Sequence, residues 1–139
     1  MLNEYQRRRV SITIRSLEKD LHVIEESLKS EGYSGIPIKI KNDIPSSVRN
    51  ALILKVGLLK EKIGNIAENF ALEMRTESIS ERIFSMLSFD WVSLEEIKAK
   101  RLRGYGEVSE GLHKSLDRKL DSLMGVVDEM LGLLTSKQK

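Results

Sequence analysis

The chain has 139 residues, no cysteine and two histidines, and its charged residues, 32% of the total, nearly cancel to a net charge of +2. The absence of cysteine excludes disulfides and thiolate metal sites and favours a reducing compartment. A balanced charge argues against a protein that binds nucleic acid through bulk charge alone. No apolar run approaches the roughly 20 residues that cross a bilayer, and the first residues lack the apolar region of a signal peptide. We therefore expect one cytoplasmic domain over residues 1–139, without membrane attachment and with a frayed tail at about 136–139.

The first predicted helix runs from about Asn3 to Lys29. Its apolar residues recur at steps of three and four, which places them in one stripe along the helix: Val10, Ile14, Leu17, Leu21, Ile24 and Leu28. A weaker apolar stripe lies on nearly the opposite side and contains Tyr5, Ile12 and Val23. A surface helix of a small monomer normally needs only one such stripe.

The segment at about 31–44 contains two glycines and a proline, which interrupt the helical pattern. Within it, Ile36, Ile38 and Ile40 alternate with other residues, as in a strand. Because no second strand pattern occurs elsewhere in the chain, we expect an extended strap that packs its isoleucines on the helices. The alternative is a short edge strand that pairs with its copy in a dimer.

The longest helical pattern extends from Pro45 to Arg75. Asn42 and Asp43 are suitable capping residues, and Pro45 suits a first helical turn. The main apolar stripe contains Val48, Leu52, Val56, Leu59, Ile63, Ile66 and Phe70, and Leu54, Leu58 and Leu72 lie opposite it. Two helices with two stripes each indicate either that both are sandwiched within the fold or that one outer stripe meets a second subunit. The predicted self-association surface of a homodimer is therefore Tyr5, Ile12, Val23, Leu54, Leu58 and Leu72.

Two short helices and one long helix are expected in the second half of the chain. Ser78 and Ser93 each begin a capping-box pattern, with Phe89 and Trp91 between the two helices, where they would fill a corner of the core. The last long helix starts at Ser109 and carries a leucine-rich stripe. The fold class predicted is therefore all-α: a helical bundle of three long and two short helices, with the strap between the first two long helices.

A basic segment at 98–105 is the densest sign of chemistry. Four of the six residues from Lys98 to Arg103 are cations, and Tyr105 follows in a glycine-flanked turn. The interpretation that the sequence favours is a solvated helix end, whose cations favour the C-terminal dipole. On the helical wheel Arg101 is expected to lean toward the other helices. Because such residues can also hold phosphates and stack a base, the alternatives are a nucleic-acid or anion contact at Lys98, Lys100, Arg103 and Tyr105 and a protein interface. The basic run Arg7 to Arg9 is a second, weaker candidate.

Recognisable catalytic and cofactor motifs are absent from the sequence. Glu110 and His113 have the Glu-x-x-His spacing of di-iron bundles, but the second copy that such a site needs is missing. His113 and Asp117, one turn apart, are expected to form a surface hydrogen bond rather than a catalytic pair. We therefore predict no enzyme activity, no metal and no cofactor.

The stretch from Arg101 to Val108 resembles part of the HEPN helical domains, many of which are ribonucleases or toxin-like partners that use an Arg-x(4–6)-His motif before the last long helix. Nine residues separate Arg103 from His113, so the motif is not met there. Arg15 and His22 have the spacing but lie on the first helix. The resemblance implies at most a non-catalytic relative, and no family is assigned from it.

The function that these patterns favour is a non-catalytic, cytoplasmic interaction or regulatory module that self-associates and has a possible protein partner. The alternative is a small RNA- or DNA-binding protein that uses residues 98–105.

Overall fold

The computed structural model describes residues 1–135. It is mostly helical (74%), with five helices and a two-stranded hairpin in that range, so the all-α prediction is confirmed. The chain divides into two compact units, Met1–Met74 and Arg75–Lys139; the single domain over 1–139 stays a prediction. The predicted frayed tail lies outside the described residues. Of the helices in residues 1–135, none is long and apolar enough to cross a membrane.

Helix α1 (Glu4–Lys29) begins where the sequence indicates. The Asn3 side chain accepts a hydrogen bond from the Gln6 backbone N–H at 2.8 Å, and the Gln6 side chain accepts one from Asn3 N at 2.9 Å. This reciprocal pair satisfies two of the N–H groups that a helix start leaves without partners. The helix ends at Lys29, and Ser30 takes an extended backbone conformation.

The segment after α1 forms a β-hairpin. The expectation that it packs its isoleucines on the helices was wrong, because Ile36, Ile38 and Ile40 are exposed. Strands β1 (Gly32–Ser34) and β2 (Lys39–Lys41) pair antiparallel, with Tyr33 opposite Ile40. Gly32 has a φ of +102°, and a Cβ there would collide with the carbonyl of Ile40, so only glycine fits. The prediction that no second strand exists was wrong, because β1 carries no apolar alternation. Since β2 finds its partner within the chain, a second copy is not needed to pair it.

Helix α2 (Ser46–Asn69) starts without a side-chain cap, and Asn42, which was predicted to cap it, makes other hydrogen bonds. Its amide Nδ2 donates to the carbonyls of Leu28 at 3.1 Å and Ser30 at 2.7 Å, so it caps the end of α1 and fastens the hairpin there. The helix also ends six residues before the predicted Arg75. Ala71 lies in the left-handed region with φ 50°, a C-terminal stop that glycine usually provides.

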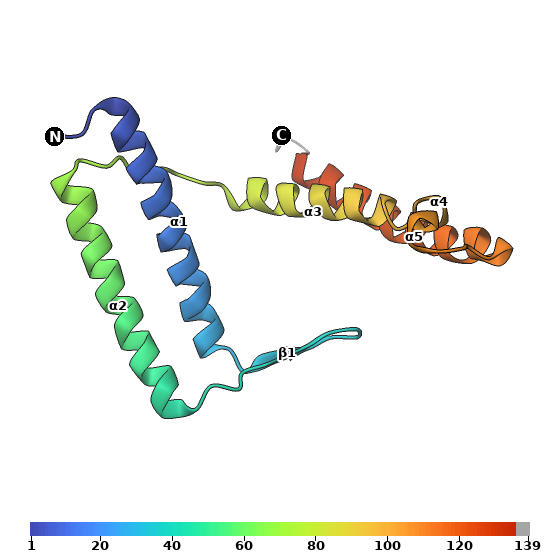
Figure 1. The fold of residues 1–139 in the computed structure, drawn as a ribbon, viewed down its shortest axis with the longest axis horizontal. Helices are drawn as coiled ribbons and strands as arrows, with labels where there is room; N and C mark the ends of the chain where they lie inside the picture. The colour runs from blue at the N-terminus through green and yellow to red at the C-terminus, as the bar shows by residue number, and fades with distance from the viewer. Residues whose placement is uncertain (136–139) are drawn as a thin grey trace. The chain divides into compact units, whose positions relative to one another are not determined.

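Helices α1 and α2 run antiparallel side by side in the first unit (Figure 1). Leu21, Val56 and Ile63 form the buried cluster between them, and Ile14 packs against it. These four residues come from the predicted main stripes of the two helices. An ion pair also joins the helices, since Lys60 Nζ donates to Glu25 Oε1 at 2.8 Å.

The Glu25–Lys60 pair makes the stability of this unit depend on pH. The hydrogen bond from Lys60 lowers the pKa of Glu25 below its ordinary value of 4.5. The stabilisation is therefore complete above that ordinary value and is lost as the pH falls through the lowered pKa. Urea unfolding of Glu25→Gln should show a lower midpoint than the wild type at neutral pH, and the two midpoints should converge in acid. Glu26→Gln, at the exposed neighbouring position, is the control; an equal pH dependence in both variants would contradict the assignment.

The second unit contains α3 (Ile79–Glu95), α4 (Ala99–Leu102), the 3-10 turn η1 (Arg103–Tyr105) and α5 (Glu110–Thr135). Ser78 caps α3 as predicted, accepting from Glu81 N at 3.3 Å. Ser93 does not start a new helix, because its hydroxyl donates to the Phe89 carbonyl one turn earlier and lies inside α3. Phe89 is 72% exposed and Trp91 is half-buried, so the expectation that Phe89 fills the core was wrong.

Helices α3 and α5 lie side by side, and α4 packs against α5 (Figure 1). Ala99, Leu120 and Met124 are the buried apolar residues of this unit within the described range. Since α3 has no fully buried residue, the packing between its apolar face and α5 is partial. The buried core of the second unit is therefore small and centres on α5.

Candidate functional site

The predicted basic segment spans the N-cap of α4, α4 itself and η1. Lys98 is the N-cap residue, and its ammonium group lies 2.8 Å from Asp121 Oδ1 and 3.3 Å from Glu95 Oε2. The hydrogen bond to Asp121, followed by that to Glu95, raises the pKa of Lys98 above its ordinary value. Lys98 is thus a cation held between α3 and α5, and it stabilises the position of α4 rather than facing a ligand.

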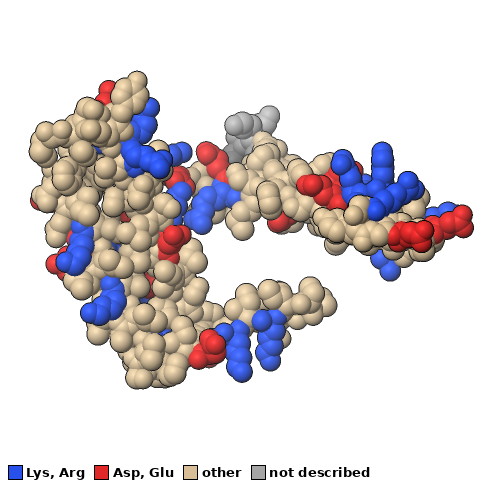
Figure 2. Space-filling model, in the orientation of Figure 1, with Lys and Arg blue, Asp and Glu red and all other residues tan. Residues whose placement is uncertain are grey.

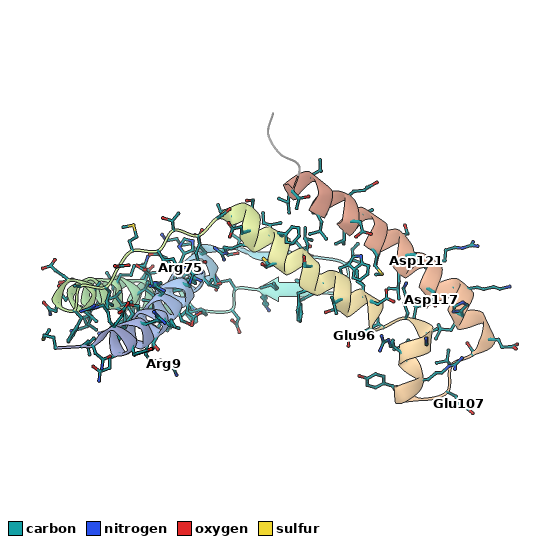
Figure 3. The ribbon with its side chains drawn as sticks, turned by 90° about the horizontal axis from the view of Figure 1, so that it is seen from above. Arg9, Arg75, Glu96, Glu107, Asp117 and Asp121 are labelled. Atoms are coloured by element: carbon teal, nitrogen blue, oxygen red, sulfur yellow. The ribbon has the colours of Figure 1, made fainter. Side chains whose placement is uncertain are left out.

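Asp117 is the second anchor of α4. Its Oδ1 accepts a hydrogen bond from the Ala99 backbone N–H at 2.8 Å, and its Oδ2 lies 2.8 Å from His113 Nδ1. Figure 3 shows Asp117 and Asp121 on the same stretch of α5, one turn apart. The predicted contact between His113 and Asp117 is therefore present, with His113 largely exposed. Both aspartates of this stretch already have partners on α4 or α5.

A hollow of about 510 Å³ lies beside these anchors, between α4 and α5. Four exposed cations line it, and they come from both helices: Lys100, Arg101, Lys114 and Arg118. Figure 2 shows lysine and arginine side chains gathered over this part of the unit. Arg101 was expected to lean toward the helices, but it is exposed. Lys114 and Arg118 were missed because they are distant in sequence, although their i, i+4 spacing already places them on one face.

The predicted contact residues do not all converge on this hollow. Lys98 and Lys100 line it, whereas Arg103 lies at a separate hollow with residues 106–109. Tyr105 is 91% exposed and shares a third hollow with Arg101. Arg101 therefore lines both the hollow of the four cations and the hollow of the exposed aromatic ring.

The arginines at the start of α1 form a weaker site. Arg7, Arg8 and Arg15 surround a small hollow together with Glu4 and Glu73. The guanidinium of Arg8 lies 5.9 Å from the centre of the Tyr5 ring, a cation–π distance. With two glutamates on its rim, this hollow has little excess positive charge.

The predicted self-association residues lie on two opposite sides of the α1/α2 pair. On α1, Tyr5, Ile12 and Val23 are exposed on the side away from α2, and Val23 lines a mainly apolar hollow with Tyr33 and Ile40 of the hairpin. On α2, Leu54 and Leu58 are exposed on the side away from α1. Leu72 is half-buried and lies beyond the end of α2. The structure therefore does not bring the six residues together on one face.

Another apolar surface of the first unit is continuous. About 100° of rotation per residue turns Leu17, Ile24, Leu52 and Leu59 by about 40–60° from the buried seam, which Leu21 and Val56 mark. Val48 is turned by about 80° in the same direction. Because α1 and α2 are antiparallel, these rotations lead to the same face of the pair. Glu25 and Lys60 are turned the other way and meet on the opposite face. The α1/α2 apolar face is 37–47% exposed at each of its residues: Leu17, Ile24, Val48, Leu52 and Leu59.

The sequence did not single out this surface because its residues belong to the main stripes that were expected to be buried. With one neighbouring helix each, α1 and α2 bury the centre of the stripe and leave one edge uncovered. The second unit repeats the arrangement. Its α3/α5 apolar face consists of exposed residues on the corresponding side of both helices: Ile79, Ile83, Met86, Leu123 and Met130.

Within residues 1–135, no three or more His, Asp or Glu side chains are grouped so that they could hold a metal ion. Comparisons with protein-family models, curated proteins and solved structures gave no match to this chain.

Proposed function

We propose that the protein is a non-catalytic interaction module that forms a homodimer through the α1/α2 apolar face. The observation that supports this is a row of five half-exposed aliphatic side chains, contributed by both helices, on one face of a two-helix layer. Isolated exposed apolar residues are common on soluble proteins, but a continuous apolar face is typical of an interaction surface.

A second copy is the occupant that suits this face best. Two two-helix layers packed face to face form a four-helix arrangement, in which every helix has two neighbours and both edges of its stripe are covered. The face is aliphatic on both helices, so it is complementary to itself. A twofold axis is the usual symmetry of such a pair.

The charged rim of the face is also complementary to itself. By the same helical rotation, exposed Asp20 borders the face on α1, and exposed Lys55 and Lys62 border it on α2. Leu21 packs with Val56 and Ile63, so Asp20 lies at the level between the two lysines. A twofold axis parallel to the helices places α1 over α2 of the second copy, and Asp20 then faces both lysines. Opposite charges at a rim favour this orientation, in which α1 packs on α2 of the second copy, rather than one in which α1 packs on α1 of the second copy.

We also propose that the module is cytoplasmic, because a chain without cysteine suits a reducing compartment. A different protein with an apolar helical face is the competing occupant, and the test distinguishes the two.

Size-exclusion chromatography with light scattering tests the proposal on the purified chain. The expected molar mass is twice the 15.9 kDa of one chain, and it should fall toward the single-chain value on dilution. High salt should screen the rim pairs but weaken the dimer only slightly, because burial of apolar area supplies most of the association. A single-chain mass at every concentration would contradict the proposal and leave the face to another protein.

A further inference from the structure

The four-cation hollow between α4 and α5 suggests a second binding activity, independent of the proposed dimer. Its rim consists of Lys100 and Arg101 from α4 and Lys114 and Arg118 from α5. In the described part of the chain none of these four side chains forms an ion pair. No direct ion pair within that range therefore holds the four rim cations.

The carboxylates that line the hollow offset part of its positive charge. Five Lys and Arg side chains and three Asp and Glu side chains line it, so these groups together keep a net charge of +2. Asp121 and Glu95 pair with Lys98, and Asp117 accepts from the Ala99 backbone N–H and contacts His113. These contacts also fix α4 on α5, so the cations of the two helices are held near one another. The hollow is therefore preformed and keeps an excess of positive charge, which favours a bound anion.

The form of the site indicates the kind of anion. All four cations are exposed and come from two helices, which suits an extended chain of phosphates more than a small enclosed ligand. Tyr105 adds an exposed aromatic ring beside Arg101, and a base can stack on such a ring. We infer that the hollow binds the phosphate backbone of a single-stranded nucleic acid, with Tyr105 as the stacking residue. Lys98 lines the hollow but is paired with Asp121 and Glu95, and Arg103 lies at a separate hollow, so we assign no phosphate contact to either.

Fluorescence anisotropy with a labelled single-stranded RNA of mixed sequence tests the inference. The double variant Lys114→Ser/Arg118→Ser should weaken RNA binding by about tenfold or more at low salt. The slope of the logarithm of the binding constant against the logarithm of the salt concentration should become shallower by about 1 to 1.5, because each of the two lost phosphate contacts contributes about 0.7 to it. The matched control is Arg82→Ser/Lys119→Ser, which removes one arginine and one lysine from the same unit. Equal losses in the two double variants would overturn the inference, as would no binding of wild type at low salt.

Two further measurements distinguish a nucleic-acid ligand from a small phosphate compound. Tyr105→Ala should weaken RNA binding by several-fold if the base stacks on the ring. Tripolyphosphate, which has phosphates but no base, should compete with RNA only weakly and equally well against wild type and Tyr105→Ala. Strong competition by tripolyphosphate, together with no effect of Tyr105→Ala, would assign the hollow to a small phosphate ligand and overturn the inference.

Discussion

Leu59→Lys is expected to convert the proposed dimer into a monomer. The side chain is 40% exposed on the α1/α2 apolar face, so a lysine is tolerated in the single chain but places a charge in the apolar centre of the interface. A twofold symmetric interface contains the substitution twice, and we expect the dissociation constant to rise by about a hundredfold. Light scattering across a concentration series measures the shift, and far-UV circular dichroism should show unchanged helix content.

The adjacent Leu58 provides a matched control. It is 44% exposed, nearly the same as Leu59, but lies on the side of α2 away from α1. Leu58→Lys should leave the dimer intact if the proposed face is correct. If instead Leu58→Lys dissociates the dimer and Leu59→Lys does not, the surface predicted from the second stripes is the interface. A dimer that survives both substitutions would contradict both surfaces and direct attention to the α3/α5 apolar face.

Leu21→Ala should give the largest loss of stability among single substitutions in the first unit. Leu21 is 2% exposed and packs with Val56 and Ile63, and this cluster is the main apolar contact between α1 and α2. Removal of a buried leucine side chain typically costs about 2–5 kcal/mol, a large share of what a small unit possesses. Urea unfolding followed by circular dichroism measures the loss, and Ile12→Ala, at an exposed position of the same helix, should cost far less.

The same variant also tests the prediction of a single domain. Trp91, the single tryptophan of the chain, lies in α3 of the second unit and reports on that unit by fluorescence. If residues 1–139 unfold as one domain, Leu21→Ala lowers the midpoint seen by tryptophan fluorescence as much as the midpoint seen by circular dichroism. A fluorescence midpoint that stays at the wild-type value would show two independent units and contradict the single-domain prediction.

Helix boundaries could be predicted where a side chain itself makes the cap. Asn3 and Ser78 form caps with local partners, and the starts of α1 and α3 were correct for that reason. The end of α2 could not be predicted, because Ala71 adopts a left-handed conformation with no glycine to indicate it. Ser93 has the sequence of a cap but uses its hydroxyl inside α3. Local pattern alone cannot distinguish these two uses of a serine hydroxyl.

The candidate sites, like the helix boundaries, could be predicted only in part. The segment at 98–105 was visible as a run of cations, yet its function depends on contacts across the fold: Asp121 engages Lys98, and α5 supplies Lys114 and Arg118. The α1/α2 apolar face was hidden because a stripe predicts burial without stating how many neighbours cover it. Both features depend on which helices pack together, and that information is not contained in a single helical period.

The hairpin between α1 and α2 bears on the solubility of the chain. Its outer edges expose unpaired backbone groups, and Ile36, Ile38 and Ile40 are all exposed on or near it. Exposed strand edges with alternating isoleucines are templates for cross-β growth. Lys39 and Lys41 alternate with these isoleucines, so stacked copies of the segment would bring like charges together along a fibril. Pro37, which lies between Ile36 and Ile38, and the two lysines therefore both oppose cross-β stacking of this segment.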